Sequence, residues 1–247
     1  MKKNQLITRR KAIITGLASI SGLLLPGCKK SLPPTYGNIL RMGDALTYAA
    51  QRTLLPGQSL AREYHYGDIS SFPATGTTNP ADPGKPSFSE AYGRIQSGAF
   101  ADWRLSVEGR VAKPGKYSLA DLQRFPPRKQ ITRHTCEEGW TAIAEWTGVP
   151  LSQVLQSAGI LPSARFVNFY SYDGYTDSVD MLDAFHPQTI LAYGMNGHDL
   201  PVPHGAPVRL RVENQIGYKS VKYLQRIVVT DQFIDTGDSG WAWYVGI

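Results

Sequence analysis

The residues with the most chemical potential in this sequence surround Cys136. It lies in the segment Arg133–Trp140, which follows the strand-like Gln130–Thr132 and which we expect to be a loop. Positive charge from Arg133 and His134 would favour the thiolate, the form that binds metals or attacks as a nucleophile. Nucleophilic catalysis with His134 or His204 as base is a real alternative. The segment alone leaves three interpretations open: metal ligand, nucleophile and inert core thiol.

A second group of polar residues, in His204–Leu210 and Gly217–Lys222, could bind a phosphorylated ligand. Arg209 offers a planar fork that matches phosphate oxygens, and Lys219 and Ser220 offer further donors. Gly217 would permit a close backbone approach. The spacing of a nucleotide-binding P-loop is absent. Taken singly, Arg209 and Lys219 would more often be solvated charges at strand ends.

Together and in this order, these segments resemble the sulfite oxidase family of molybdopterin-dependent oxidoreductases. The resemblance extends from about Ala101 to Asp231 and includes Ala144–Leu151 and Leu191–Pro201. It implies a molybdenum–molybdopterin cofactor, with Cys136 as the thiolate ligand of the metal, a soft ligand suited to this site. The positions that the resemblance implies for cofactor binding are Phe72, Thr75, His134, His204, Arg209, Gly217, Lys219 and Ser220.

The residues just after Cys136 bear on the reaction. Sulfite-oxidising members place arginine there, whereas this chain has the acidic and aromatic Glu137–Thr141, which would repel a sulfite dianion. The pattern is closer to the bacterial branch that reduces sulfoxides, including methionine sulfoxide in proteins. We therefore expect reductive oxygen-atom transfer, with oxidation of sulfite or another small anion as the alternative. Glu138 is the candidate for proton delivery, and a surface acid is an equally good interpretation.

The resemblance also implies a redox partner. Cys-x-x-Cys-His is absent from the sequence, and too few cysteines remain for an iron–sulfur cluster. We expect electrons to come from a haem-containing membrane protein or a cytochrome. The chain ends 16 residues after Asp231, too soon for a further dimerisation domain, so a monomer is expected. The alternative from another class is a cofactor-free lipoprotein binding module, in which Cys136 would be spare.

The charge of the chain is concentrated at its N-terminus. The total is 26 basic and 20 acidic residues, and five of the bases lie in the first 28 residues, where there is no acid. The remainder therefore carries 21 bases against 20 acids, which does not favour a nucleic-acid-binding surface.

The first 28 residues have the layout of an export signal. Arg9 and Arg10 precede an apolar run, as in a twin-arginine signal for proteins exported in the folded state. Leu25–Cys28 resembles a lipobox, whose cysteine is lipidated. The run is shorter than the ~20 residues of a spanning helix. We expect a periplasmic protein tethered to the membrane through Cys28.

Three regions follow from these patterns: the signal at 1–28, an irregular wrapping segment at 29–97, and a catalytic core at 98–247. The core is expected to form strands at 103–107, 167–172, 208–212 and 227–229, and helices after Ser118 and Pro150. Strands and short helices without a βαβ rhythm predict an α+β fold of a single domain, with mixed sheets of the sulfite oxidase type.

The export hypothesis has a direct test. Replacing Arg9 and Arg10 together by Lys should leave the protein in the cytoplasm, because the twin-arginine route depends on that pair. Cys28→Ala should instead abolish incorporation of labelled lipid while export continues. Fractionation and metabolic labelling measure both. Normal export of the double Lys variant would contradict the hypothesis.

Overall fold

The computed structural model describes residues 46, 49–50, 53–54 and 59–234. They belong to one of two compact units, Ala45–Ile247. The predicted signal with Arg9, Arg10 and Cys28 lies outside the described residues. Within them, no helix combines the length and the apolar character that a membrane crossing requires.

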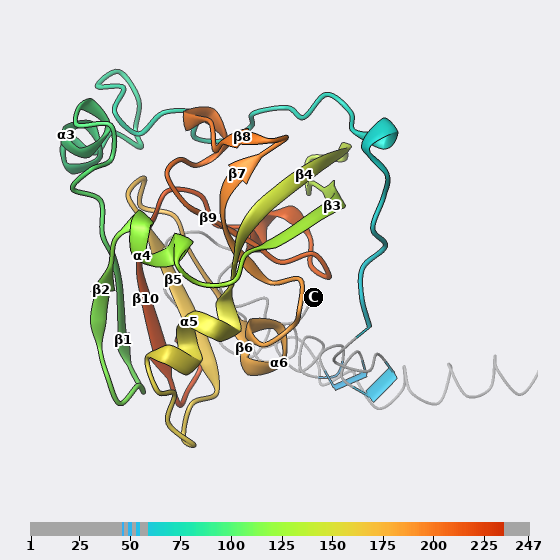
Figure 1. Cartoon of the computed structure of the whole chain (residues 1–247), viewed down its shortest axis with the longest axis vertical. Helices are drawn as coiled ribbons and strands as arrows, with labels where there is room; N and C mark the ends of the chain where they lie inside the picture. The colour runs from blue at the N-terminus through green and yellow to red at the C-terminus, as the bar shows by residue number, and fades with distance from the viewer. Residues whose placement is uncertain (1–45, 47–48, 51–52, 55–58, 235–247) are drawn as a thin grey trace, which may run out of the picture. The chain divides into compact units, whose positions relative to one another are not determined.

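The first of two sheets mixes parallel and antiparallel strands (Figure 1). Only β1 and β10 pair in parallel, and the remaining neighbours are antiparallel. The order across the sheet is β2 (Gly115–Tyr117), β1 (Leu105–Gly109), β10 (Leu224–Thr230), β5 (Phe166–Ser171) and β6 (Thr176–Asp180). The mixed sheet of the predicted fold class is confirmed.

The second sheet is antiparallel and carries most of the residues singled out in the sequence. Its long hairpin of β3 and β4 is paired without a break from Arg128 opposite Gly148 to Thr135 opposite Thr141. The strands in order are β3 (Arg128–Thr135), β4 (Thr141–Pro150), β7 (Ile190–Met195) and β8 (His198–Asp199), with β9 (Arg209–Arg211) also paired to β7. Pairing of β9 with β7 brings the two predicted motif regions onto one sheet.

The described helices are short, as predicted. Ser118 caps α4 (Leu119–Gln123): its hydroxyl accepts from the Asp121 amide at 3.1 Å, and Asp121 accepts from the Ser118 amide at 3.0 Å. α5 (Leu151–Ser157) follows Pro150, and Gly159 behind it has φ +70°. α6 (Met181–Ala184) is a single turn, and 3-10 turns occupy η1 (Tyr66–Asp68), η2 (Val202–His204) and η3 (Gly217–Lys219).

The helix α3 (Glu90–Ser97) departs from the irregular structure expected for 29–97. Its N-cap Ser89 accepts from the Tyr92 amide at 3.2 Å, and Arg94 pairs with Glu90 one turn away at 2.8 Å. Eight residues are too few for an apolar repeat to be recognised. The buried Tyr92 attaches the helix to the core, since its hydroxyl donates to the Ala206 carbonyl at 2.7 Å.

Two apolar clusters hold the unit together. The larger contains Trp103, whose indole donates to the Leu224 carbonyl at 2.9 Å and is fully buried with side chains from both sheets. The smaller, which we call the Trp146 cluster, underlies the second sheet and consists of Ala144, Trp146, Ile190, Ala192, Met195 and Leu200, with Phe72 packed against it. Burial alternates along β3, so His134 faces inward and Arg133 faces solvent.

The segment before α3 runs along the second sheet. The Tyr64 amide donates to the Ile131 carbonyl at the outer edge of β3, at 2.8 Å. Ser70 then bonds the backbone of Ile143 in β4 in both directions, at 3.0 and 2.9 Å. These bonds position the chain so that Phe72 lies beside His134, one of the predicted site residues.

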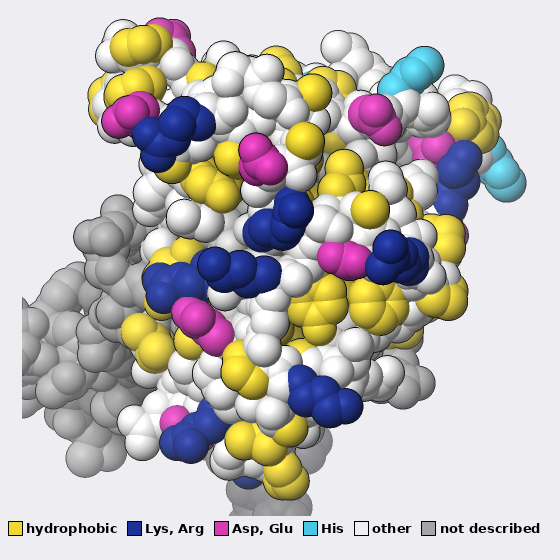
Figure 2. All heavy atoms as spheres, turned by 60° about the vertical axis from the view of Figure 1, so that its left-hand side comes forward, with side chains coloured by type: hydrophobic (Ala, Val, Ile, Leu, Met, Phe, Trp, Pro, Cys, Tyr) yellow, Lys and Arg dark blue, Asp and Glu magenta, His cyan; other side chains and the backbone are white. Residues whose placement is uncertain are grey.

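Charged side chains of both signs cover the face over β1, β2 and α4. Figure 2 shows Lys and Arg interspersed there with acidic and apolar side chains. Some of them form exposed ion pairs, such as Arg226 with Glu108 at 3.2 Å and Arg124 with Asp121 at 2.9 Å. Exposed pairs of this kind stabilise a fold by little.

The contact between β4 and β7 depends on Gly148. A Cβ there would lie 2.3 Å from the Leu191 carbonyl oxygen, so Gly148→Ala must separate the two strands. We expect a loss of roughly 1–3 kcal/mol or more in the free energy of unfolding, measured by denaturant titration. Gly115→Ala in β2 is the matched control, because nothing lies within 4 Å of its Cβ position. Equal stability of the two variants would contradict this account of the strand contact.

Candidate active site

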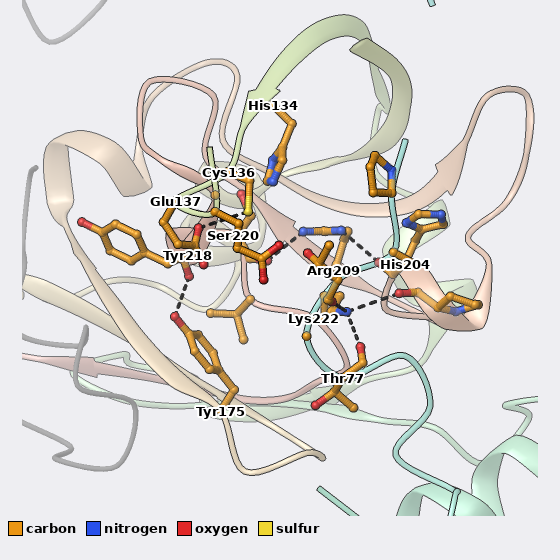
Figure 3. Close-up of a pocket in the computed structure, with 18 of the residues that line it drawn as sticks. Thr77, His134, Cys136, Glu137, Tyr175, His204, Arg209, Tyr218, Ser220 and Lys222 are labelled. Atoms are coloured by element: carbon orange, nitrogen blue, oxygen red, sulfur yellow. Dashed lines mark hydrogen bonds between the residues drawn. The ribbon is translucent and has the colours of Figure 1, made fainter. Parts of the chain in front are cut away.

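A cavity of about 450 Å³ lies where the second sheet, the β5–β6 turn and the segment after Ser70 meet (Figure 3). Its volume falls within the range of small-molecule sites. All but one of the predicted site residues line it. They are Phe72, Thr75, His134, Cys136, Glu138, His204, Arg209, Gly217 and Ser220.

Cys136 is the first residue of the turn that joins β3 to β4. Its amide donates to the Trp140 carbonyl at 2.9 Å, and the Gly139 amide returns to the Cys136 carbonyl at 3.1 Å. Gly139 has φ +90°, a conformation in which side chains are strained. Arg133, His134 and Thr135 belong to β3, so the loop begins three residues later than expected.

The positive charge expected beside the thiol is not there. The Arg133 guanidinium lies over the Tyr64 ring, 5.2 Å from its centroid, on the outer face of β3. Burial, Arg211 and Arg209 lower the pKa of His134 to about 2, so this imidazole is neutral. Burial raises the pKa of the Cys136 thiol, to which Glu137 and Glu138 add. A bound metal ion would favour the thiolate in place of these missing charges, because a thiol binds a metal in its deprotonated form.

His134 is held by a buried pair behind the cavity. Arg211 lies 2.6 Å from its Nδ1 and bonds Glu213 through two nitrogens, at 3.1 and 2.7 Å. Because arginine only donates, Nδ1 accepts and Nε2 carries the proton. Gly217 packs against this ring: a Cβ would lie 2.6 Å from Nε2. The close approach that Gly217 permits is therefore to His134.

Arg209 forms the basic end of the cavity together with Ser220. Arg209 is 4% exposed, and its guanidinium donates to the carbonyls of His204 and Ser220, at 3.1 and 2.9 Å. None of the ion pairs among the described residues includes Arg209. Burial and the neighbouring Arg211 lower its pKa to about 9. A buried cation without a carboxylate is costly, and an anion in the cavity would offset that cost.

Lys222 is the second cation at this end. Its ammonium donates to the carbonyls of Thr75 at 2.8 Å, Pro203 at 3.3 Å and Thr77. Burial and Arg209 lower its pKa to about 8. It therefore holds residues 72–77 as one wall of the cavity while adding positive charge beside Arg209.

Lys219, predicted to bind the cofactor phosphate, is not brought to the cavity. Its fully buried ammonium pairs with Asp177 at 2.8 Å and donates to the Ser178 carbonyl at 3.0 Å. The chain leaves the η3 turn at Ser220, with φ −89° and ψ 68°, so that Lys219 and Lys222 point to different sides. Of the two lysines of this motif, Lys222 lines the cavity and Lys219 does not.

The opposite end of the cavity is acidic and aromatic (Figure 3). A Glu137 carboxylate oxygen lies 3.6 Å from the Cys136 sulfur, and Glu138 accepts from the Trp140 indole at 3.1 Å. Phe72 contacts four rings with centroids 5.1–5.6 Å away, those of His134, Trp140, Trp146 and His204. The edge-on contact of Phe72 with Trp140 joins the wall at 72–77 to the Cys136 turn.

Several cavity residues were not identified from the sequence. Lys222 and Glu137 stand inside motifs that the sequence analysis had isolated, so the signal for them was present. Asp173 and Tyr175 come from the turn between β5 and β6, which carried no motif. Only the pairing of distant strands brings that turn to Cys136.

Comparisons with known proteins identify the family. The profile of the oxidoreductase molybdopterin-binding domain matches residues 92–236, more than half of the chain. The chain belongs to this family. It is a molybdopterin-dependent oxidoreductase of the sulfite oxidase type, and the match does not favour the cofactor-free binding module.

Two similar proteins are named as subunits of protein-methionine-sulfoxide reductases. An Azospira oryzae protein named as protein-methionine-sulfoxide reductase subunit YedZ1 is 32% identical over 96% of this chain and 87% of its own length. The catalytic subunit MsrP of a protein-methionine-sulfoxide reductase from Ralstonia nicotianae is 34% identical over 53% of this chain and 44% of its own.

Among solved structures, the sulfane dehydrogenase SoxCD of Paracoccus pantotrophus superposes with a TM-score of 0.51 at 28% identity. The match covers 53% of this chain and 39% of that one. The molybdopterin-binding chain thus spans less than half the length of the Ralstonia and Paracoccus proteins.

The residues fit a phosphorylated pterin with a metal. Arg209 is buried and its charge lowers the pKa of the partly buried Lys222, so a phosphate at this end of the cavity would stabilise both cations. Cys136 lies at the other side of the cavity as the one described cysteine. Among the described residues, no group of three or more His, Cys, Asp or Glu could hold a metal ion by itself.

Cofactor retention tests this assignment. Arg209→Gln and Lys222→Gln should each weaken binding by ~1.5–3 kcal/mol, the value of a hydrogen bond to a charged group. Protein from a molybdenum-replete host should then lose molybdenum and pterin in parallel, measured per chain by elemental mass spectrometry and oxidised-pterin fluorescence. The control is Lys113→Gln, at an exposed lysine. Full pterin content in Arg209→Gln would contradict a phosphate site at this residue.

Proposed function

We propose that this molybdopterin-dependent oxidoreductase transfers oxygen in the reductive direction, converting sulfoxides, including methionine sulfoxide in proteins, to sulfides. The observation that carries the proposal is the acidic and aromatic environment of the Cys136 sulfur. Glu137, Glu138 and Trp140 supply it. A neutral sulfoxide with an apolar substituent suits such walls.

The same environment disfavours the oxidation of sulfite. The Lys and Arg side chains that line the cavity are Arg209 and Lys222, which stand at the phosphate end. No described ion pair neutralises Glu137 or Glu138. An approaching dianion would meet two carboxylates first. The names of the Azospira and Ralstonia relatives support the reductive direction.

When bound, molybdopterin would supply the oxygen-atom and two-electron chemistry of each turnover. The chain contributes the remaining functions. Cys136 ligates the metal through sulfur, Arg209 and Lys222 bind the phosphate, and Phe72 closes the aromatic wall. We assign proton delivery to Glu138, whose carboxylate the Trp140 indole holds at the cavity mouth.

We propose that a haem-containing membrane protein or a cytochrome reduces the cofactor. Both curated relatives are named as subunits, which implies that they act with another chain. A monomeric, exported and lipid-tethered form remains our proposal for this chain, supported by the Arg9, Arg10 and Cys28 pattern. An anchor at the membrane would keep the enzyme near such a partner.

Substitutions at Cys136 and Glu138 test this mechanism. A hydroxyl is a harder and far less acidic ligand than a thiol. Cys136→Ser should therefore change the molybdenum(V) electron paramagnetic resonance signal and abolish sulfoxide reduction with an artificial donor. Glu138→Gln should leave the spectrum intact and slow turnover on the order of 10²-fold.

The outcomes separate the possible roles. An unchanged spectrum in Cys136→Ser would refute thiolate ligation and favour a nucleophile. Full activity in Glu138→Gln would make that residue a bystander. Oxidation of sulfite in preference to reduction of sulfoxide by the wild-type enzyme would overturn the proposed function itself.

A further inference from the structure

A buried ion pair lies behind the cavity and has no part in the mechanism so far. Asp177 and Lys219 are both about 1% exposed and are joined at 2.8 Å. The same Asp177 oxygen accepts from the Ser178 amide at 2.7 Å. A buried pair of this kind contributes little net stability relative to apolar side chains of the same size. Its presence beside a cofactor site points to a role in the chemistry.

Tyr175 connects this pair to the cavity. The second carboxylate oxygen of Asp177 lies 3.3 Å from the Tyr175 hydroxyl, and Tyr175 lines the cavity. The hydroxyl donates to the Tyr218 carbonyl at 2.9 Å, as Figure 3 shows. A phenolic hydroxyl both donates and accepts, and its hydrogen can rotate. The Tyr175 hydroxyl therefore lies between the Asp177 carboxylate and the cavity.

The proposed reaction needs such a connection. Reduction of a sulfoxide breaks the sulfur–oxygen bond, consumes two electrons and two protons, and releases a sulfide and water. The electrons come from the redox partner through the cofactor. Glu138 accounts for one proton, and the second has to come from elsewhere in a cavity that cofactor and substrate fill.

We propose that Asp177 stores this second proton and that Tyr175 passes it into the cavity. In the step, the Tyr175 hydroxyl turns from the Tyr218 carbonyl towards the ligand, gives up its proton and takes the one held by Asp177. After water has left, a proton returns from the solvent in the cavity by the same path. Lys219 is a positioning residue that holds the carboxyl in place. The inference rests on the proposed function.

The electrostatic surroundings favour a stored proton at mildly acidic pH, because the pKa of the Asp177 carboxyl is raised. Burial raises the pKa of Asp177 to about 6, against the opposing effect of Lys219. Burial, Asp177 and Glu137 raise the pKa of Tyr175, so the phenol stays protonated. The titratable groups facing the pair are Tyr218 from η3, Tyr175 from the turn before β6, Glu137 from the Cys136 turn, Asp180 from β6 and Asp183 from α6.

The test compares holoenzymes over a pH series. Asp177→Asn alone would leave Lys219 buried without a carboxylate and is expected to unfold, so the variant of choice is the double Asp177→Asn, Lys219→Met. Tyr175→Phe removes the connecting hydroxyl only. Tyr170→Phe is the matched control, because Tyr170 does not line the cavity. Its ring packs against the Arg226 guanidinium, whose Cζ lies 4.1 Å from the ring centroid. Dimethyl sulfoxide and reduced methyl viologen serve as substrate and donor.

Proton storage by Asp177 predicts a particular pH profile. The donor form exists below its folded pKa, so wild-type kcat should fall as pH rises through about 6 and above. Tyr175→Phe and the double variant should lower kcat on the order of 10²-fold at low pH and flatten this decline, with KM changed less than about threefold. A uniform loss of kcat with the wild-type pH profile retained would indicate a structural role and overturn the proposal.

A second measurement separates this inference from the proposed function. Infrared difference titration of the holoenzyme should show a protonated carboxyl band that disappears near pH 6, is kept in Tyr175→Phe and is missing from the double variant. Absence of the band in wild type would overturn the proton store even if sulfoxides are reduced. A normal band without any sulfoxide reduction would overturn the proposed function alone.

Discussion

The burial of Arg209 is the constraint on which the rest of the site depends. A guanidinium placed on a strand in the middle of the fold, 4% exposed and bonded only to carbonyl groups, needs a negative charge nearby. The nearest buried carboxylate, that of Glu213, is used by Arg211. The compensating anion has to enter from the cavity, and the phosphate of molybdopterin is suited to it.

The arrangement around Arg209 follows from this need. Lys222 serves two purposes, since it adds charge at the phosphate end and holds the carbonyls of Thr75 and Thr77. The wall at 72–77 therefore depends on the same cation as the phosphate site. Phe72 ties that wall to the Cys136 turn through its ring contacts. Phosphate binding and the geometry at the metal ligand are thereby coupled through one short segment.

The charge of the cavity changes sign along its length. Arg209 and Lys222 stand at one end, and Glu137 and Glu138 stand beside the Cys136 sulfur at the other. Such a division separates the binding of an anionic cofactor from the selection of a substrate that is not an anion. The two histidines that line the cavity add no positive charge to it, because burial and the neighbouring cations lower the pKa of His134 to about 2 and that of His204 to about 4.

The sequence by itself determined the fold class, the family and most of the residues that line the cavity, because those signals are local. The capping box at Ser118, the strand patterns and the Cys136 motif depend on residues close together in the chain. The sequence did not predict α3, because a helix of eight residues is too short for a helical repeat of apolar residues to be recognised.

Only the tertiary structure decided which charged groups face the cavity. The turn at Ser220 sends Lys219 to Asp177 and Lys222 to the basic end of the cavity, and β3 turns Arg133 outward. The packing of the first sheet against the second brings Tyr175 into the cavity that Cys136 lines. The direction of a side chain relative to distant strands is set by packing and pairing, which no local pattern encodes.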